Sequence, residues 1–260
     1  MANVNVDKLT ITSIDEITCF NNANELEFIM DEIQDGAINN TQEKTDITGK
    51  LGRKIGSLKK NKGVTVTATN GWIVGGALAA QTGSKIEQGT YRVRISETVT
   101  VKSNAATLEG KAVGTVGAEI GTMYHKNPNG TLGEKITQSA GAPEANQFQY
   151  TPTGNTLKFH DGEIPDGTEL VAFFDIEVEA AKISNDSETY SKTLKMYIDV
   201  TLTDSCENLY HGQFVIPRAD FSGEFELTMG GDPTVHAIEA ESLVGGCTGS
   251  TKLWDLIVYV

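Results

Sequence analysis

Residues 190–203 read YSKTLKMYIDVTLT. Apolar side chains fill every second position from 194 to 202, namely Leu194, Met196, Ile198, Val200 and Leu202. An apolar period of two predicts a β-strand with one face on a core, so Ile198 should be buried. At about 3.3 Å per residue the stretch would extend roughly 45 Å, which is about the width of a compact globule of this length. We therefore expect the strand to cross the whole domain or to project and pair with a neighbouring subunit.

Three further stretches show the same alternation. They are VTVTAT at residues 64–69, YRVRISETVTVK at 91–102 and ELVAFFDIEVEAAK at 169–182. In the last of these, one face is apolar throughout, and the other face ends in Asp175, Glu177 and Glu179. These patterns predict a mainly β protein, of β-sandwich or barrel-like architecture, whose extended strands are completed by neighbouring subunits.

One stretch predicts a short flanking α-helix. Apolar residues follow helical spacing there, at Leu26, Ile29, Met30 and Ile33. Asn22 or Asn24 could cap its start, and Gly36 could end it. Acidic residues near its C-terminal end oppose the helix dipole, and they suggest an external cationic partner.

A single domain spanning residues 1–260 is the simplest organisation. Residues 125–166 differ in composition, because they hold four of the six prolines together with many Gly and Asn residues. This passage predicts a loop-rich insertion on the main sheet.

Charge is distributed unevenly in this acidic chain of net charge −14. Such a balance argues against tight binding to nucleic acid or to anionic membranes. The passage 50–63 is an exception and carries six cations, namely Lys50, Arg53, Lys54, Lys59, Lys60 and Lys62. We expect these cations to meet Asp31, Glu32 and Asp35 of a neighbouring copy. A solvated loop and a phosphate contact are the alternatives.

Catalytic and cofactor motifs are missing from the sequence. The four histidines lack metal-ligand spacing, and solvent-facing positions are expected for them. No nucleophile elbow or P-loop is present, so we predict no enzyme activity, no cofactor and no metal. Cys19, Cys206 and Cys247 indicate free thiols, although a Cys206–Cys247 bridge is an alternative. Neither a signal peptide nor a membrane span is visible, so synthesis in the cytoplasm is expected.

Two segments, residues 46–84 and 210–244, resemble the major tail (tail tube) proteins of bacteriophages that infect Gram-positive bacteria. The first leads from the Lys-rich passage through VTVTATNG into GGALAAQTG; the second contains GEFELTMGGD followed by His236. The resemblance implies a virion structural subunit that forms hexameric rings. Stacked rings would make a tube that conducts genome DNA without binding it tightly and that meets other tail proteins at its ends.

Two questions stay open within this resemblance. Asp175, Glu177 and Glu179 could line the lumen and repel DNA, or they could lie on the outside or at a contact. The type of tail is also not distinguished. The competing functions are another virion protein such as a major capsid protein, which would need a long spine helix, and a host- or carbohydrate-binding β module, which would need clustered aromatic residues.

Overall fold

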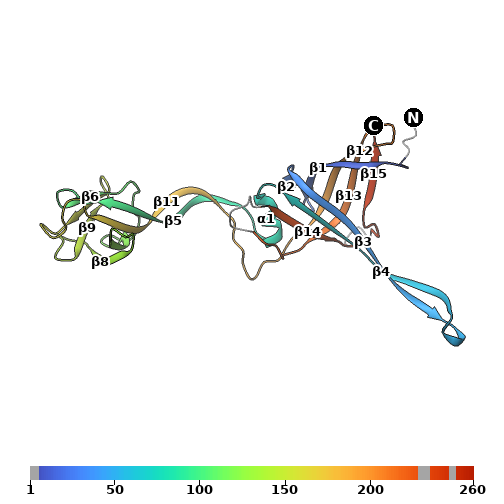
Figure 1. Ribbon diagram of the computed structural model, residues 1–260, viewed down its shortest axis with the longest axis horizontal. Coiled ribbons are helices and arrows are strands. Elements are labelled where there is room, and N and C mark those ends of the chain that lie inside the picture. Colours follow the sequence, from blue (N-terminus) through green and yellow to red (C-terminus); the bar gives the residue numbers. More distant parts are fainter. Residues whose placement is uncertain (1–5, 228–234, 246–249) are drawn as a thin grey trace. The chain divides into compact units, whose positions relative to one another are not determined.

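The computed structural model describes residues 6–227, 235–245 and 250–260 (Figure 1). Cys247, and with it the alternative of a Cys206–Cys247 bridge, lies outside these residues. The chain is mainly β, with one α-helix among the described residues, which confirms the predicted fold class. It forms two compact units. Unit 1 comprises residues up to Glu87 together with Lys182–Val260, and unit 2 comprises Gln88–Ala181.

Unit 1 is a single sheet that curls into a half-barrel, in the order β2-β1-β12-β13-β14-β4-β3, with β15 also pairing with β13. The strand bounds are β1 (Thr10–Phe20), β2 (Leu26–Met30), β3 (Ile33–Thr48), β4 (Lys54–Asn70), β12 (Thr193–Thr203), β13 (Leu209–Phe221), β14 (His236–Ser242) and β15 (Asp255–Tyr259). A short 3₁₀ turn (Lys50–Gly52) joins β3 to β4.

Strand β12 lies in the middle of this sheet and confirms the alternation that predicted it. Its five apolar residues from Leu194 to Leu202 are all buried, and the residues between them are half-exposed. Ile198 pairs with Ile17 of β1 on one side and with Phe214 of β13 on the other. The strand therefore supplies one wall of the unit 1 core, where apolar burial is the main stabilising contribution.

The helix predicted around residues 26–33 is wrong. Residues Leu26–Met30 form β2, and the next strand begins at Ile33. Over so few positions a helical and an alternating pattern overlap, and pairing with β1 decides between them: Met30 lies opposite Ile17, and Phe28 lies opposite Cys19. Phe28 and Met30 are buried, whereas Ile29 is exposed. The helix-dipole argument for a cationic partner therefore fails here.

The α-helix of the structure is α1 (Gly75–Thr82), further along the chain. Gly76 allows α1 to lie close to β2, because a Cβ atom there would stand 2.6 Å from the Cβ of Phe28. Gly83 ends the helix with a φ of +71°, a conformation that costs glycine little. No helix among the described residues has both the length and the apolar character needed to span a membrane.

Unit 2 is a second sheet, in the order β5-β11-β7-β8-β9-β10-β6. Its strands are β5 (Glu87–Thr100), β6 (Ala105–Thr107), β7 (Ile120–Lys126), β8 (Leu132–Ser139), β9 (Gln147–Thr151), β10 (Thr156–Phe159) and β11 (Glu169–Lys182). The sheet buries its own core, whose largest members include Phe148, Phe159 and Phe174.

The expected insertion and unit 2 differ in extent. Residues 125–166 lie inside the longer span Gln88–Ala181 and hold β8, β9 and β10 rather than loops alone. Two physical reasons explain the difference. These strands are short and separated by Pro- and Gly-containing turns, so their composition is that of a loop. Both ends of unit 2 lie within the long strands β5 and β11, where the composition does not change.

Candidate assembly surface

Strands β3 and β4 form a long hairpin that extends beyond the core of unit 1 (Figure 1). The pairing runs from Ile33 opposite Asn70 to Thr48 opposite Lys54. We call residues 33–40 and 64–70 the hairpin root, and residues 41–63 the hairpin tip. In the root, every second residue of β4 from Val64 to Asn70 is buried, whereas no residue of the tip is buried. The tip is therefore a strand pair without a core.

Large apolar side chains of the tip lie in solvent. Their exposed fractions are 49% for Ile47, 97% for Leu51, 64% for Ile55 and 57% for Leu58. Ile47 and Leu58 share one face of the hairpin, because Thr45 lies opposite Leu58 and Ile47 lies opposite Gly56. Exposed apolar side chains gathered on one element are typical of a surface that binds another protein.

The tip also holds the six predicted cations. Lys54 Nζ lies 2.6 Å from Asp46 Oδ1, and Lys60 Nζ lies 3.8 Å from Glu43 Oε2. Within the described part of the chain, the other four cations have no ion pair. Counting all of residues 41–63, seven Lys and Arg residues against two acids give a net charge of +5. Residues 10–40, by contrast, hold seven acids and no Lys or Arg, a net charge of −7.

The structure places the predicted acidic partners away from the tip. Asp31 and Glu32 lie between β2 and β3, and Asp35 lies opposite Thr69 at the root. All three are exposed. The backbone N–H of Glu32 donates to Oδ1 of the buried Asn70, which holds this turn against the end of β4. The acids and the tip cations therefore occupy opposite ends of the hairpin, and the predicted contact between them stays a prediction about neighbouring copies.

The acidic residues of β11 lie in unit 2 beside partners on β5. Arg94 Nε lies 2.7 Å from Asp175 Oδ1, and Arg92 Nε lies 3.5 Å from Glu177 Oε1. The hydroxyl of Thr90 donates to Glu179 Oε1 over 2.6 Å. The hydrogen bond from Arg94 lowers the pKa of the Asp175 carboxyl. The alternation of residues 91–102 already put both arginines on one face, but only the register of β5 with β11 brings them to these acids. Lumen lining stays a prediction for the three acids.

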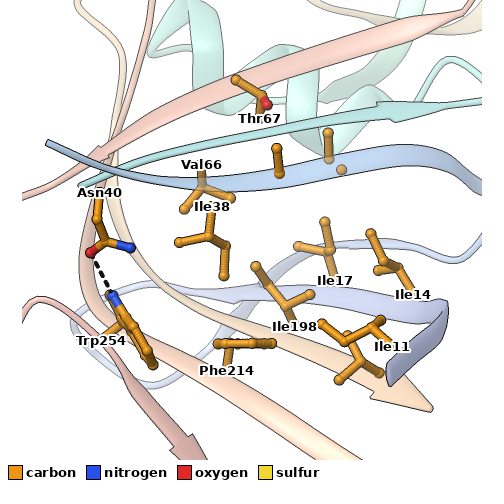
Figure 2. Close-up of a pocket in the computed structure, with 14 residues that line it drawn as sticks. Ile11, Ile14, Ile17, Ile38, Asn40, Val66, Thr67, Ile198, Phe214 and Trp254 are labelled. Atoms are coloured by element: carbon orange, nitrogen blue, oxygen red, sulfur yellow. Dashed lines mark hydrogen bonds between the residues drawn. The ribbon is translucent and has the colours of Figure 1, made fainter. Parts of the chain in front are cut away.

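A groove of about 490 Å³ opens beside the hairpin root, between β3 and β4 on one side and β1, β12 and β13 on the other. Figure 2 shows Ile38 and Val66 facing Ile198 and Phe214 across it. At one end, Trp254 Nε1 donates to Asn40 Oδ1 over 3.1 Å, and the rings of Trp254 and Phe214 lie 5.6 Å apart. The lining is thus largely apolar. The sequence analysis did not predict this groove, because its residues come from six separate segments.

A buried polar cluster ties α1 to β14. Nδ1 of His236 accepts from the N–H of Val74 over 3.2 Å, and Nε2 of His236 lies 2.8 Å from Gln81 Oε1. Gln81 Nε2 in turn donates to the carbonyl of Ala237. Burial lowers the pKa of the His236 imidazole. The expectation of a solvent-facing histidine is wrong for His236, since two neighbouring elements close over it and satisfy both ring nitrogens.

The chain was compared with protein families and with curated proteins. The family model described as the YomU/Tube protein family matches residues 9–252, which is nearly the whole chain and takes in both units. No curated protein matches the chain.

Proposed function

This chain belongs to the YomU/Tube protein family, and we propose that its copies form hexameric rings that stack into a phage tail tube for the passage of genome DNA. The family assignment confirms the resemblance to phage tail tube proteins. It makes the chain a structural component of the virion tail, with copies of itself and other tail proteins as partners. Ring size, stacking, DNA conduction, contacts at the tube ends and synthesis in the host cytoplasm belong to the proposal.

The hairpin tip is the observation that carries this proposal. A strand pair with both faces in water gains little from burial, yet the tip keeps four large apolar side chains exposed. Covering each of them in an interface would stabilise the assembly by about 1.5–3 kcal/mol before entropic costs. In a subunit that polymerises, such an element can form an interface with another copy. In a protein that stays monomeric, it would only promote aggregation.

Charge supports assembly between copies of the chain. The tip is basic and residues 10–40 are acidic, so the tip of one copy is electrostatically complementary to the root region of another. The predicted partners Asp31, Glu32 and Asp35 belong to this acidic segment. Because each chain presents both surfaces, the same contact can be repeated from copy to copy.

The net charge of −14 suits a channel for a polyanion, because like charges oppose tight binding of DNA. Asp175, Glu177 and Glu179 are the proposed lumen residues. The arginines of β5 reduce the net charge of that face, so repulsion of DNA would depend on the whole chain rather than on this row. A structure of the assembled ring in which the three carboxylates point away from the axis would contradict this part of the proposal.

Negative-stain imaging of the purified protein tests the main proposal. We expect rings or tubes, and fewer of them as the NaCl concentration rises, because salt screens the contact between tip and root. Lys59, Lys60 and Lys62 replaced by Glu should prevent assembly. The matched control replaces the exposed Lys102, Lys111 and Lys158 of unit 2, which changes the net charge by the same amount.

Three outcomes would overturn the proposal. Closed shells would indicate a capsid protein, and folded monomers at every concentration would indicate a binding module. Equal loss of assembly in the tip variant and in the unit 2 control would show that net charge, and not the hairpin tip, governs association.

A further inference from the structure

The groove of unit 1 lies between the edges of β1 and β3. Strand β1 pairs with β2 only from Ile17 to Phe20, so its outer edge from Thr10 to Glu16 is unpaired within the described residues. On the other side of the groove, β3 pairs with β4 alone. Both strands border the groove but form no ladder with each other. Unpaired strand edges beside an apolar groove can accept an added element.

The floor of the groove is buried, as at Val66 and Ile198, but several side chains at its rim are only partly covered. Ile11 is 49% exposed, and Ile14, Ile38, Phe214 and Trp254 are of intermediate exposure. The last four of these residues pack against the periphery of the unit 1 core. The volume of about 490 Å³ is within the range of clefts that bury a ligand or several side chains. The core of unit 1 therefore ends in an apolar surface that the described residues leave partly uncovered.

The hairpin tip carries apolar side chains that the described residues leave exposed, and it cannot reach its own groove. The groove includes Gly36, Ile38 and Asn40 of the hairpin root, and β3 stays paired with β4 from there to Thr48, with register shifts at Gln42/Glu43 and Ile47/Thr48. At about 3.3 Å per residue, Thr48 lies roughly 26 Å further along the strand than Asn40. Folding back would require breaking this ladder. A tip that enters such a groove must come from a second copy.

Apolar and charged groups both fit this arrangement. Leu51 stands at the end of the hairpin, with Ile47 and Leu58 behind it on one face, and seven cations surround them against two acids. The groove has an apolar lining, and two of the strands that border it, β1 and the root part of β3, belong to the segment 10–40 with seven acids and no Lys or Arg. An apolar centre with complementary charges around it is the usual composition of a specific protein interface.

We propose that the apolar groove between β1 and β3 is the docking site for the β3–β4 hairpin tip of a second copy, with Leu51, Ile47 and Leu58 as the inserted side chains. This inference deepens the proposed function and rests on it. Donor and acceptor are different surfaces of one chain, so the contact is heterologous and repeats around a ring or along a tube. Trp254 and Asn40, whose hydrogen bond lies at one end of the groove, then become part of an interface between copies.

Photo-crosslinking tests the contact directly. The variant Leu51→p-benzoylphenylalanine is irradiated as the full chain at increasing concentration, and its crosslinked peptides are identified by mass spectrometry. We expect a covalent dimer in which position 51 is joined to groove peptides containing Ile11, Ile38 or Trp254. The same crosslinker at Leu132 of unit 2, which has the exposed fraction of Ile11 (49%), is the control. Crosslinks from position 51 to other surfaces, or the absence of a dimer, would overturn the inference.

Tryptophan fluorescence gives an independent readout. The chain has two tryptophans, and Trp72→Phe leaves Trp254 as the reporter of the groove. On association we expect its emission to move to shorter wavelength and its quenching by acrylamide to fall several-fold. Ile11→Lys, which places a cation at the groove opposite a basic tip, should abolish both changes, and Leu132→Lys should not.

These measurements separate the two proposals. Tubes in which Trp254 is quenched as in the monomer, or tubes formed normally by Ile11→Lys, would refute docking in the groove and leave the tail tube function standing. A groove crosslink in a protein that never forms rings or tubes would support the docking site and count against the tail tube function. Unchanged unfolding of Ile11→Lys and Leu132→Lys, measured by circular dichroism, shows that both chains are folded.

Discussion

The root and the tip of the β3–β4 hairpin are made by the same two strands, and they differ in what lies on either side of them. The root rests on the unit 1 core, and Val64, Val66 and Ala68 of β4 are buried there. The tip continues the ladder into solvent, where no residue is buried. The comparison shows that backbone pairing can extend a strand pair well beyond the core on which it packs. Burial within unit 1 does not account for the extended part of the hairpin, and we propose that it serves in assembly.

The strongest test of this difference compares an acidic substitution in each half. Val66→Asp would bury an unpaired carboxylate in the core, so we expect a loss of about 4 kcal/mol or more in the free energy of unfolding. Leu58→Asp in the tip should change it by no more than about 0.5 kcal/mol, because position 58 is in solvent. Urea unfolding followed by circular dichroism measures both. Comparable losses would show that the tip is held against the protein rather than free.

A smaller effect should appear with pH, and only at the root. His236 lies opposite Asn70 of β4, and burial lowers its pKa, so the folded state favours the neutral imidazole. The unfolded state takes up a proton below about pH 6.5. The stability contributed by neutral His236 is therefore complete above that pH and is lost as the pH falls toward the lower pKa of the folded state.

Melting temperatures measured from pH 7.5 to 5.5 check this prediction. We expect the wild-type melting temperature to fall over this interval. His236→Gln should melt lower at pH 7.5 and show a weaker pH dependence, while the exposed His160→Gln should keep the wild-type slope. An equal slope in His236→Gln would assign the pH dependence to other groups.

The smallest effect is expected from breaking the ion pair of the tip. Lys54 and Asp46 lie 2.6 Å apart, but about half of each side chain is exposed to solvent. Exposed pairs contribute little, since water and salt screen them. Asp46→Asn should thus lower the free energy of unfolding by about 0.5 kcal/mol or less, measured by the same urea titration. A much larger loss would mean that the tip is ordered by its own charges.

Local pattern was enough where a long strand has a core beside it. The alternation from Leu194 to Leu202 predicted β12 and its buried face, and both are confirmed. It failed where the core was missing: KLGRKIGSLKKNKG has no apolar alternation, so the hairpin tip did not appear as a strand pair. Residues 26–33 fitted two periods, and only the partner strand β1 selected the β one.

Long-range register placed the rest of the candidate surfaces. The acids of β11 were noticed as a row, but their arginine partners depend on how β5 aligns with β11. The groove is formed only where β1, β3, β4, β12, β13 and Trp254 come together. His236 became a buried residue only because α1 and β14 meet around it. None of these contacts can be predicted from a short window of sequence.

The amino-acid sequence alone determined that this protein is acidic, mainly β and similar to tail tube subunits, because composition, charge and side-chain period are properties of neighbouring residues. Tertiary structure decided where the helix lies, which acids are paired, and which strands extend beyond the core. Each of these features depends on the segment that packs beside it. The β-ladder joins residues far apart in the chain, and the free energy of pairing is set by both strands together.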